Sequence, residues 1–176
     1  FSKAPHGPPV LESTFTQVIK PPTRDIWQTE SFPFALSQEE LDNGVPFKVA
    51  WAAFSHWKSL HCIDNAVVVG HNVRHYDLPL LKRHCLENAV ACFEPEHILD
   101  TLSWSRRKRV GCTRRLQDVY NHIQSASLDA KSWLLSPDPL RSHRALSDAK
   151  MSCAIACHAL NLEETERWAS CDVLGV

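Results

Sequence analysis

The sequence lacks long apolar runs and a recognisable targeting segment. No stretch reaches the roughly 18 to 20 uninterrupted apolar residues that a membrane-spanning helix requires. The N-terminus lacks the charged, apolar and small-residue segments that form a signal peptide in that order. The seven cysteines are odd in number and irregularly spaced, which argues against a compact disulfide scaffold. We therefore expect a protein of a reducing, intracellular compartment, nuclear or cytoplasmic, that does not enter a membrane.

The chain also has very little net charge, −1 at neutral pH over 176 residues. Domains that bind nucleic acid by bulk electrostatics are usually strongly basic, so any nucleic-acid contact here must be local. The first of two basic clusters is either a phosphate track beside a site or a solvated loop. The two clusters are Arg106, Arg107, Lys108 and Arg109, and further on Arg114 and Arg115.

No internal repeat and no low-complexity tract divides the chain, and its length suits one globular domain with a core. We expect a loop or tail over residues 1–9, one domain over residues 10–170 and a tail over residues 171–176. Strand patterns alternate with helix patterns, which indicates an α/β fold. The strands are expected at Val10–Ile19, Ala66–Val69 and, as a strand or turn, Ile98–Leu102. The helices are expected after Ser37, from about Pro46, and at Leu78–Leu86, Leu116–Ile123 and Leu146–Leu160.

The most informative segment is the β-branched run that ends at Gly70, His71 and Asn72 and is followed by Asp77. This order places a carboxylate at the C-terminal edge of a sheet, where active sites of α/β folds gather. Asp77 is then either a ligand of a hard divalent cation or a cap of the helix that starts at Leu78.

A second pair of polar residues lies near the C-terminal end of the sequence. His143 precedes Asp148 by five positions, and Asp148 opens an amphipathic helix. The helix would hold the carboxylate rigidly, while a histidine on the loop before it could reach a water molecule. The alternative is a loop histidine beside an aspartate that complements the helix dipole.

Together, and in this order, the two segments resemble the second and third motifs of the DEDDh 3′-5′ exonucleases of the RNase-H-like superfamily. His71, Asn72 and Asp77 match the second motif, and His143 and Asp148 match the third. The wording of residues 76–81 is closest to the three-prime repair exonuclease and proofreading-subunit branches. The resemblance implies an RNase-H-like mixed sheet flanked by helices.

The chain departs from the family pattern at the first motif, an Asp-x-Glu on the leading strand. Glu12 has no aspartate two positions earlier, because Val10 stands there. The resemblance therefore indicates an N-terminally truncated domain that lacks the leading strand or strands, and an impaired activity for this chain taken alone.

In the family, four carboxylates hold two Mg²⁺ or Mn²⁺ ions about 3.5–4 Å apart over the scissile phosphate. By resemblance, Asp77 and Asp148 are metal ligands and His143 is the general base, a task that suits a side chain titrating near neutral pH. The substrate would be the 3′ end of DNA or RNA, and the product a nucleoside 5′-monophosphate. The rival hypothesis is a non-catalytic, exonuclease-like module that binds nucleic acid or protein inside a larger protein. The expected nucleic-acid contacts are His71, Asn72, Arg106, Arg107, Lys108 and Arg109.

Two further residue groups allow more than one interpretation. Cys153, Cys157 and His158, with Cys171 or His84 nearby, form either a zinc site or buried free thiols against a helical core. The tryptophans suit core or edge packing, and Trp104, beside the basic residues, is the one to test for stacking on a base. The tryptophans in question are Trp51, Trp57, Trp104, Trp133 and Trp168.

Overall fold

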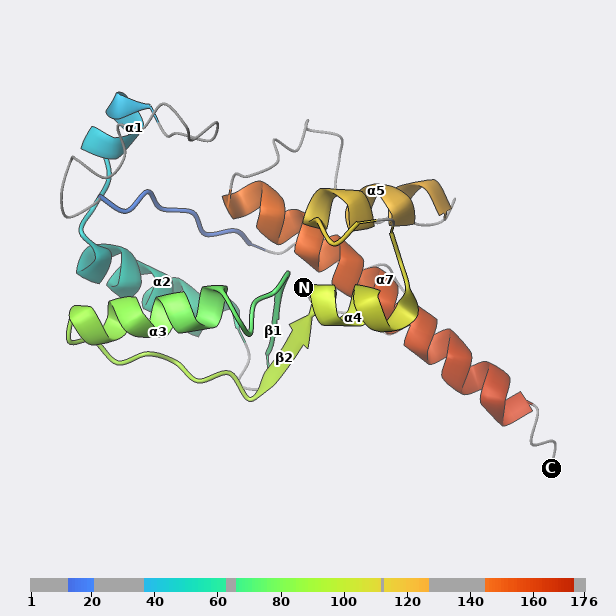
Figure 1. Cartoon of the computed structure of the whole chain (residues 1–176). Coiled ribbons are helices and arrows are strands. Elements are labelled where there is room, and N and C mark those ends of the chain that lie inside the picture. The colour runs from blue at the N-terminus through green and yellow to red at the C-terminus, as the bar shows by residue number, and fades with distance from the viewer. Residues whose placement is uncertain (1–12, 21–36, 63–65, 112, 127–144, 173–176) are drawn as a thin grey trace.

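The computed structural model describes residues 13–20, 37–62, 66–111, 113–126 and 145–172, and of residues 162–172 only the backbone. Helices and strands alternate along most of this part of the chain (Figure 1), as the sequence predicts for an α/β fold. The elements are α1 (Gln38–Asp42), α2 (Phe47–His61), β1 (Val67–Gly70), α3 (Asp77–Glu87), β2 (His97–Asp100), α4 (Thr101–Lys108), α5 (Leu116–Ala126) and α7 (Ala145–Asp172).

The sheet of the described residues consists of β1 and β2, which pair in parallel. The register runs from Val67 opposite His97 to Gly70 opposite Asp100, so both strands end at the same edge. α3 forms the crossover between the strands, as a parallel pair requires. The chain segments that follow β1 and β2 therefore start side by side, at the edge where an α/β fold carries its site.

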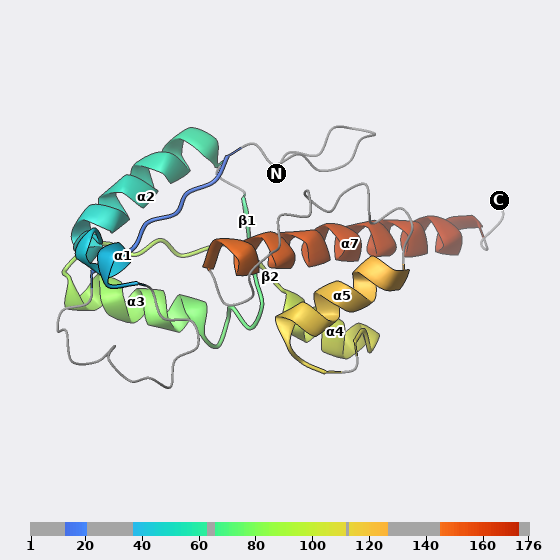
Figure 2. The ribbon, with the colours of Figure 1, turned by 90° about the horizontal axis from the view of Figure 1, so that it is seen from above.

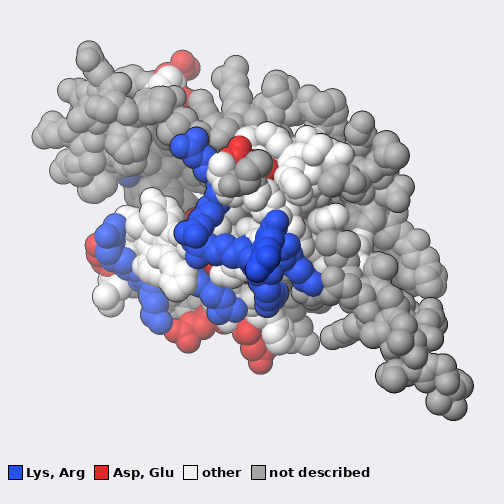
Figure 3. Space-filling model, turned by 45° about the vertical axis from the view of Figure 1, so that its right-hand side comes forward, with Lys and Arg blue, Asp and Glu red and all other residues white. Residues whose placement is uncertain are grey.

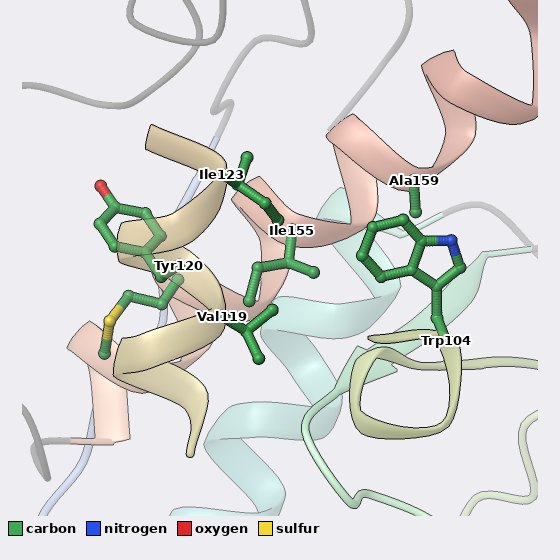
Figure 4. Packing of buried hydrophobic residues seen from close by; sticks show 7 residues of the cluster. Trp104, Val119, Tyr120, Ile123, Ile155 and Ala159 are labelled. Atoms are coloured by element: carbon green, nitrogen blue, oxygen red, sulfur yellow. The ribbon is translucent and has the colours of Figure 1, made fainter. Parts of the chain in front are cut away.

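The main core lies between α4, α5 and α7 (Figure 4). α7 packs against α5, α4 and β1, and Figure 2 shows it passing α4 and α5 and continuing toward the C-terminus. Trp104 is only 1% exposed within this core, and its ring meets His158 edge-on. The hypothesis that Trp104 stacks on a base is therefore wrong, because the ring is enclosed by protein. The buried cluster comprises Trp104, Val119, Tyr120, Ile123, Met151, Ile155 and Ala159.

A second, aromatic cluster joins α2 to its neighbours. Trp51 donates its indole N–H to the carbonyl of Ala91 at 2.9 Å, and Trp57 donates to the hydroxyl of Ser13 at 2.8 Å. These two tryptophans thus serve packing, as predicted, while Trp133 and the side chain of Trp168 lie outside the described residues. Neighbouring ring centroids in the cluster lie 5.4–6.1 Å apart, and its rings belong to Phe15, Phe47, Trp51, Phe54, Trp57, His61, His84 and Phe93.

The starts of α1 and α2 follow the sequence signals closely. Ser37 and Glu40 form the capping box of α1, and α2 begins directly after Pro46. The predicted strand at Val10–Ile19 is wrong for its described part, residues 13–19, which forms a single bridge between Ile19 and Val45.

None of the helices that the structure describes is both long and apolar enough to cross a bilayer.

Helix α4 was not predicted. It has few apolar residues, and its last turn consists of Arg106, Arg107 and Lys108. The segment at residues 106–109 is therefore the end of a helix with Arg109 as its C-cap, not the solvated loop that was the alternative. Basic side chains are favourable there, because the end of a helix carries partial negative charge.

Substitutions on α7 should separate its buried face from its exposed face. Ile155 is fully buried and Leu160 is 54% exposed. Ile155→Ala should lower the free energy of unfolding by about 2–5 kcal/mol, because it leaves a cavity. Leu160→Ala, the matched control, should change it by no more than about 0.5 kcal/mol. Urea unfolding curves of the two variants measure this difference, and equal losses would contradict the packing of α7.

Candidate active site

The turn after β1 is tight and depends on Gly70. A Cβ atom at Gly70 would lie 2.7 Å from the Cβ of Val73, closer than two such atoms approach, so a larger residue does not fit. Asn72 follows with a left-handed φ of 66°, which asparagine tolerates better than most residues. Its carbonyl accepts the N–H groups of His75 and Tyr76 at 3.1 and 3.0 Å. This turn brings Asp77 to the first position of α3.

Asp100, at the end of β2, fixes that turn to α4. Asp100 is only 5% exposed, and a buried carboxylate requires hydrogen-bond donors to offset the loss of contact with water. Its oxygens accept backbone N–H groups from both segments, so the carboxylate caps α4 and holds the turn after β1. The donors are Asn72 (3.0 Å), Arg74 (3.4 Å), Leu102 (3.0 Å) and Ser103 (3.3 Å).

His71 makes a second connection across the edge of the sheet. Its Nδ1 lies 3.0 Å from the hydroxyl of Thr101, and its Nε2 lies 2.9 Å from the carbonyl oxygen of Arg114. Thr101 also donates its hydroxyl to the carbonyl of Gly70 at 3.2 Å. Both ring nitrogens of His71 are thus engaged within the protein. The expected contact of His71 with nucleic acid, and that of the Asn72 side chain, stay predictions.

The carboxyl groups of Asp77 and Asp148 lie in one electrostatic neighbourhood. Partial burial of the Asp77 carboxyl group raises its pKa, although the residue as a whole is exposed. Its own backbone N–H and the nearby His71 act in the opposite direction, while the charges of Asp100 and Asp148 raise the pKa further. Asp148 contributes from the first turn of α7. Negative charge therefore gathers at the edge where β1 and β2 end.

This accumulation of charge suits a cation, but it does not complete a metal site. Carboxylate oxygens are the ligands that Mg²⁺ and Mn²⁺ prefer. Among the described residues, however, no group of three or more His, Cys, Asp or Glu side chains is arranged to hold a metal ion. Asp77 and Asp148 fit one part of a site for a hard cation. The remaining oxygens would come from water, from a substrate phosphate or from the rest of the chain.

Other residues predicted for the site fall into two groups. His143 and Glu12 lie outside the described residues. Burial, with a smaller effect of the nearby Cys157, raises the pKa of Cys153 to about 11, so the Cys153 thiol is protonated at neutral pH without a bound metal. The side chain of Cys171 also lies outside the described part, so the zinc hypothesis has two described thiols and no complete ligand set.

Basic side chains form a band on one face of the molecule (Figure 3). Arg106, Arg107 and Arg109 are exposed at the end of α4. Arg114 and Arg115 are also exposed, in the segment that returns from α4 to α5. The backbone of Arg114 contacts His71 at the edge of the sheet, whereas the basic residues of α4 lie at the end of the helix that points away from this edge.

One exposed aromatic residue near the site was not identified from the sequence. Tyr76 is 65% exposed and directly precedes Asp77. A surface ring beside a carboxylate could stack on a nucleobase. The one signal for Tyr76 in the sequence was its position within the second motif, between Asn72 and Asp77.

Comparison with known proteins agrees with the predicted exonuclease family. A family model described as "Exonuclease" matches residues 12–156. This range contains β1, β2, Asp77, His143 and Asp148. No curated protein and no solved structure matches the chain.

The repulsion between the two aspartates can be tested by titration. Removing the charge of Asp148 favours the ionised form of Asp77, so Asp148→Asn should lower the pKa of Asp77. Carboxyl ¹³C NMR across a pH series measures this shift. Glu87→Gln, which removes a carboxylate from the far end of α3, is the matched control and should leave the pKa of Asp77 unchanged. An unaltered titration of Asp77 in Asp148→Asn would show that the two groups are too far apart to share a cation.

Proposed function

Because the chain belongs to the exonuclease family, we propose that it is a DEDDh-type, metal-dependent 3′-5′ exonuclease that releases nucleoside 5′-monophosphates from DNA or RNA. The observation that supports this most directly is the electrostatic interaction of Asp77 and Asp148 where two parallel strands end. These are the two aspartates that match the second and third motifs of the DEDDh family. The α/β fold agrees with an RNase-H-like domain.

The proposed roles follow from the chemistry of each side chain. Asp77 and Asp148 would hold Mg²⁺ or Mn²⁺. Such ions, when bound, stabilise the negative charge that builds up on the phosphate and favour ionisation of a water molecule. His143 would accept the proton of the attacking water, because a histidine titrates close to neutral pH. Asp100 has a positioning role in this proposal, since its Oδ1 accepts three backbone N–H groups.

The basic band would bind the backbone of the nucleic acid. Arg106 to Arg109 lie on the helix that begins at Asp100, and phosphate contacts of this kind position a substrate without reading its sequence. Tyr76, exposed beside Asp77, would stack on the terminal base. Such contacts suit a substrate that is held by its end, whatever its sequence.

One observation favours the second candidate function, a binding module without catalysis. The described residues provide two of the carboxylates that a two-metal site requires, and they contain no group of three potential ligands. The two candidates differ in what completes the site. The enzyme requires an additional Asp-x-Glu segment close to Asp77 and Asp148, and the module requires none.

The nuclease proposal predicts where activity is lost and how it is regained. The 176-residue chain alone should degrade an oligonucleotide labelled at its 5′ end slowly, because its motif residues supply two carboxylates, Asp77 and Asp148, and two carboxylates bind a hard cation weakly. A chain extended upstream by a segment with Asp-x-Glu should shorten the oligonucleotide from its 3′ end in Mg²⁺ or Mn²⁺. In the extended chain, His143→Ala should lower the rate by about 10²–10⁴-fold, the usual contribution of a general base.

His122→Ala is the matched histidine control, since His122 lies on the exposed side of α5. Full activity of the 176-residue chain would contradict the requirement for the added carboxylates. A folded, extended chain that stays inactive with either metal would support the binding module.

The basic run should contribute to binding through charge alone. Neutralising residues 106–109 with glutamine should weaken binding equally for oligonucleotides of different sequence. The slope of log K against log salt should fall by about 0.7 for each phosphate of a single strand that the variant no longer neutralises. Fluorescence anisotropy in EDTA measures both effects without hydrolysis. Lys48→Gln, on the exposed side of α2, is the control, and an unchanged slope in the 106–109 variant would exclude the run from the interface.

A further inference from the structure

The segment between α4 and α5 is fixed in place by hydrogen bonds and packing at several points. Gly111 adopts a left-handed φ of 83° where the chain passes Val119, a conformation that a glycine allows without strain. The hydroxyl of Thr113 donates to Asp118 and accepts the N–H of Arg115 at 3.2 Å. The carbonyl of Arg115 accepts the N–H groups of Asp118 and Val119 in the first turn of α5. These interactions attach the segment to α5 and leave the Arg114 side chain exposed.

His71 attaches the same segment to the edge of the sheet, through the carbonyl of Arg114 at 2.9 Å. A carbonyl only accepts, so Nε2 must donate to it. Thr101 has one hydroxyl proton, which it donates to Gly70, and its oxygen can therefore accept a hydrogen bond from Nδ1 of His71. The ring thus joins β1, α4 and the Arg114 segment.

The course of the backbone distinguishes Arg114 from the basic run on α4. α4 starts at the edge of the sheet and rises about 1.5 Å per residue, so its last turn lies roughly 10 Å away from that edge. The chain then returns, and at Arg114 its backbone again touches a residue of the edge. That residue, His71, is close enough to Asp77 for its charge to lower the pKa of the aspartate. Among the basic residues of α4 and of the segment that follows it, Arg114 is therefore the one whose backbone is hydrogen-bonded to the edge that carries the acidic site.

We propose that Arg114 binds the nucleic-acid phosphate next to Asp77, and that His71 is the positioning residue that holds Arg114 there. The inference rests on the proposed function and deepens it, since it assigns a phosphate-binding side chain at the same site. It gives His71 an indirect role, because both of its ring nitrogens are occupied within the protein. A guanidinium group suits this task, as it presents several N–H donors to phosphate oxygens in a fixed plane.

The test is a double-mutant cycle on binding of a fluorescein-labelled single-stranded oligonucleotide in EDTA. Arg114→Ala should weaken binding about tenfold, the value of a hydrogen bond to a charged group, and should reduce the salt slope by about 0.7. His71→Ala should cause a similar loss. The double variant should bind no more weakly than either single variant, because both substitutions remove the same interaction with phosphate. His71→Gln retains an N–H donor and should recover part of the affinity.

Arg83→Ala, on the exposed side of α3, is the control. Its small effect on affinity should add to that of His71→Ala. Hydrogen exchange supplies a readout that needs no nucleic acid. The amides of residues 110–115 should exchange faster in His71→Ala and remain protected in Arg114→Ala, since the latter retains the carbonyl that accepts from His71.

Additive losses in the cycle, or unchanged affinity in Arg114→Ala, would overturn the proposal while leaving the exonuclease function intact. The Arg114→Ala arm decides this even if His71→Ala does not fold, because the Arg114 side chain is exposed. If the unsubstituted chain binds no oligonucleotide, the phosphate site and the proposed function fail together. The exchange measurement would then still report whether His71 holds the segment.

Discussion

The buried carboxylate of Asp100 is the interaction on which the arrangement of the site depends. It ends one strand, caps the helix that follows and accepts N–H groups from the turn after the neighbouring strand. A charged group with so little water around it is stable only with its donors in place, and losing the acceptor would leave the buried N–H of Leu102 unsatisfied, at a cost of about 1–3 kcal/mol, together with three partly buried N–H groups. The turn that carries Asp77 is therefore held by the strand beside it. The position of Asp77 is thus set mainly by the hydrogen bonds between this turn and Asp100, at the end of β2.

Repulsion between the carboxylates at this edge costs the folded protein stability, and a bound cation would relieve it. Asp77 is ionised less readily than an ordinary aspartate, because its carboxyl group is partly buried and two other carboxylates act on it. Such an arrangement is common at sites that receive a cation, since the ion relieves the repulsion that the folded protein bears without it. The basic residues do not cancel this charge, because they lie on the segments around the edge. The metal site and the phosphate site of the proposed function would thus occupy adjoining regions.

The sequence predicted the elements that carry strong local signals. The β-branched run of β1 and the helix start after Ser37 each reflect a local requirement of the backbone, and each was found where the pattern indicated. α4 was missed because its exposed face is wholly polar, and its place in the fold is set by Asp100 and by the core around Trp104. The role of His71 also could not be predicted, because its partners lie 30 and 43 positions away. The expected strand at residues 13–19 had suitable residues but forms only one bridge, to Val45. Alternation of apolar and polar residues does not make a strand when no partner strand pairs with it.

α7 links the proposed site to the hydrophobic core. Its first turn carries Asp148, and within the next two turns the same helix buries Met151 and Ile155 in the core. A helix transmits displacement along its axis with little loss, since every residue is held by hydrogen bonds to its own turns. Sequence drift in this core is therefore restricted by chemistry as well as by stability, because a new packing that shifts α7 by a fraction of an ångström also shifts a carboxylate of the site. Divergent versions of the domain should keep the volume of these core positions more strictly than folding alone would require.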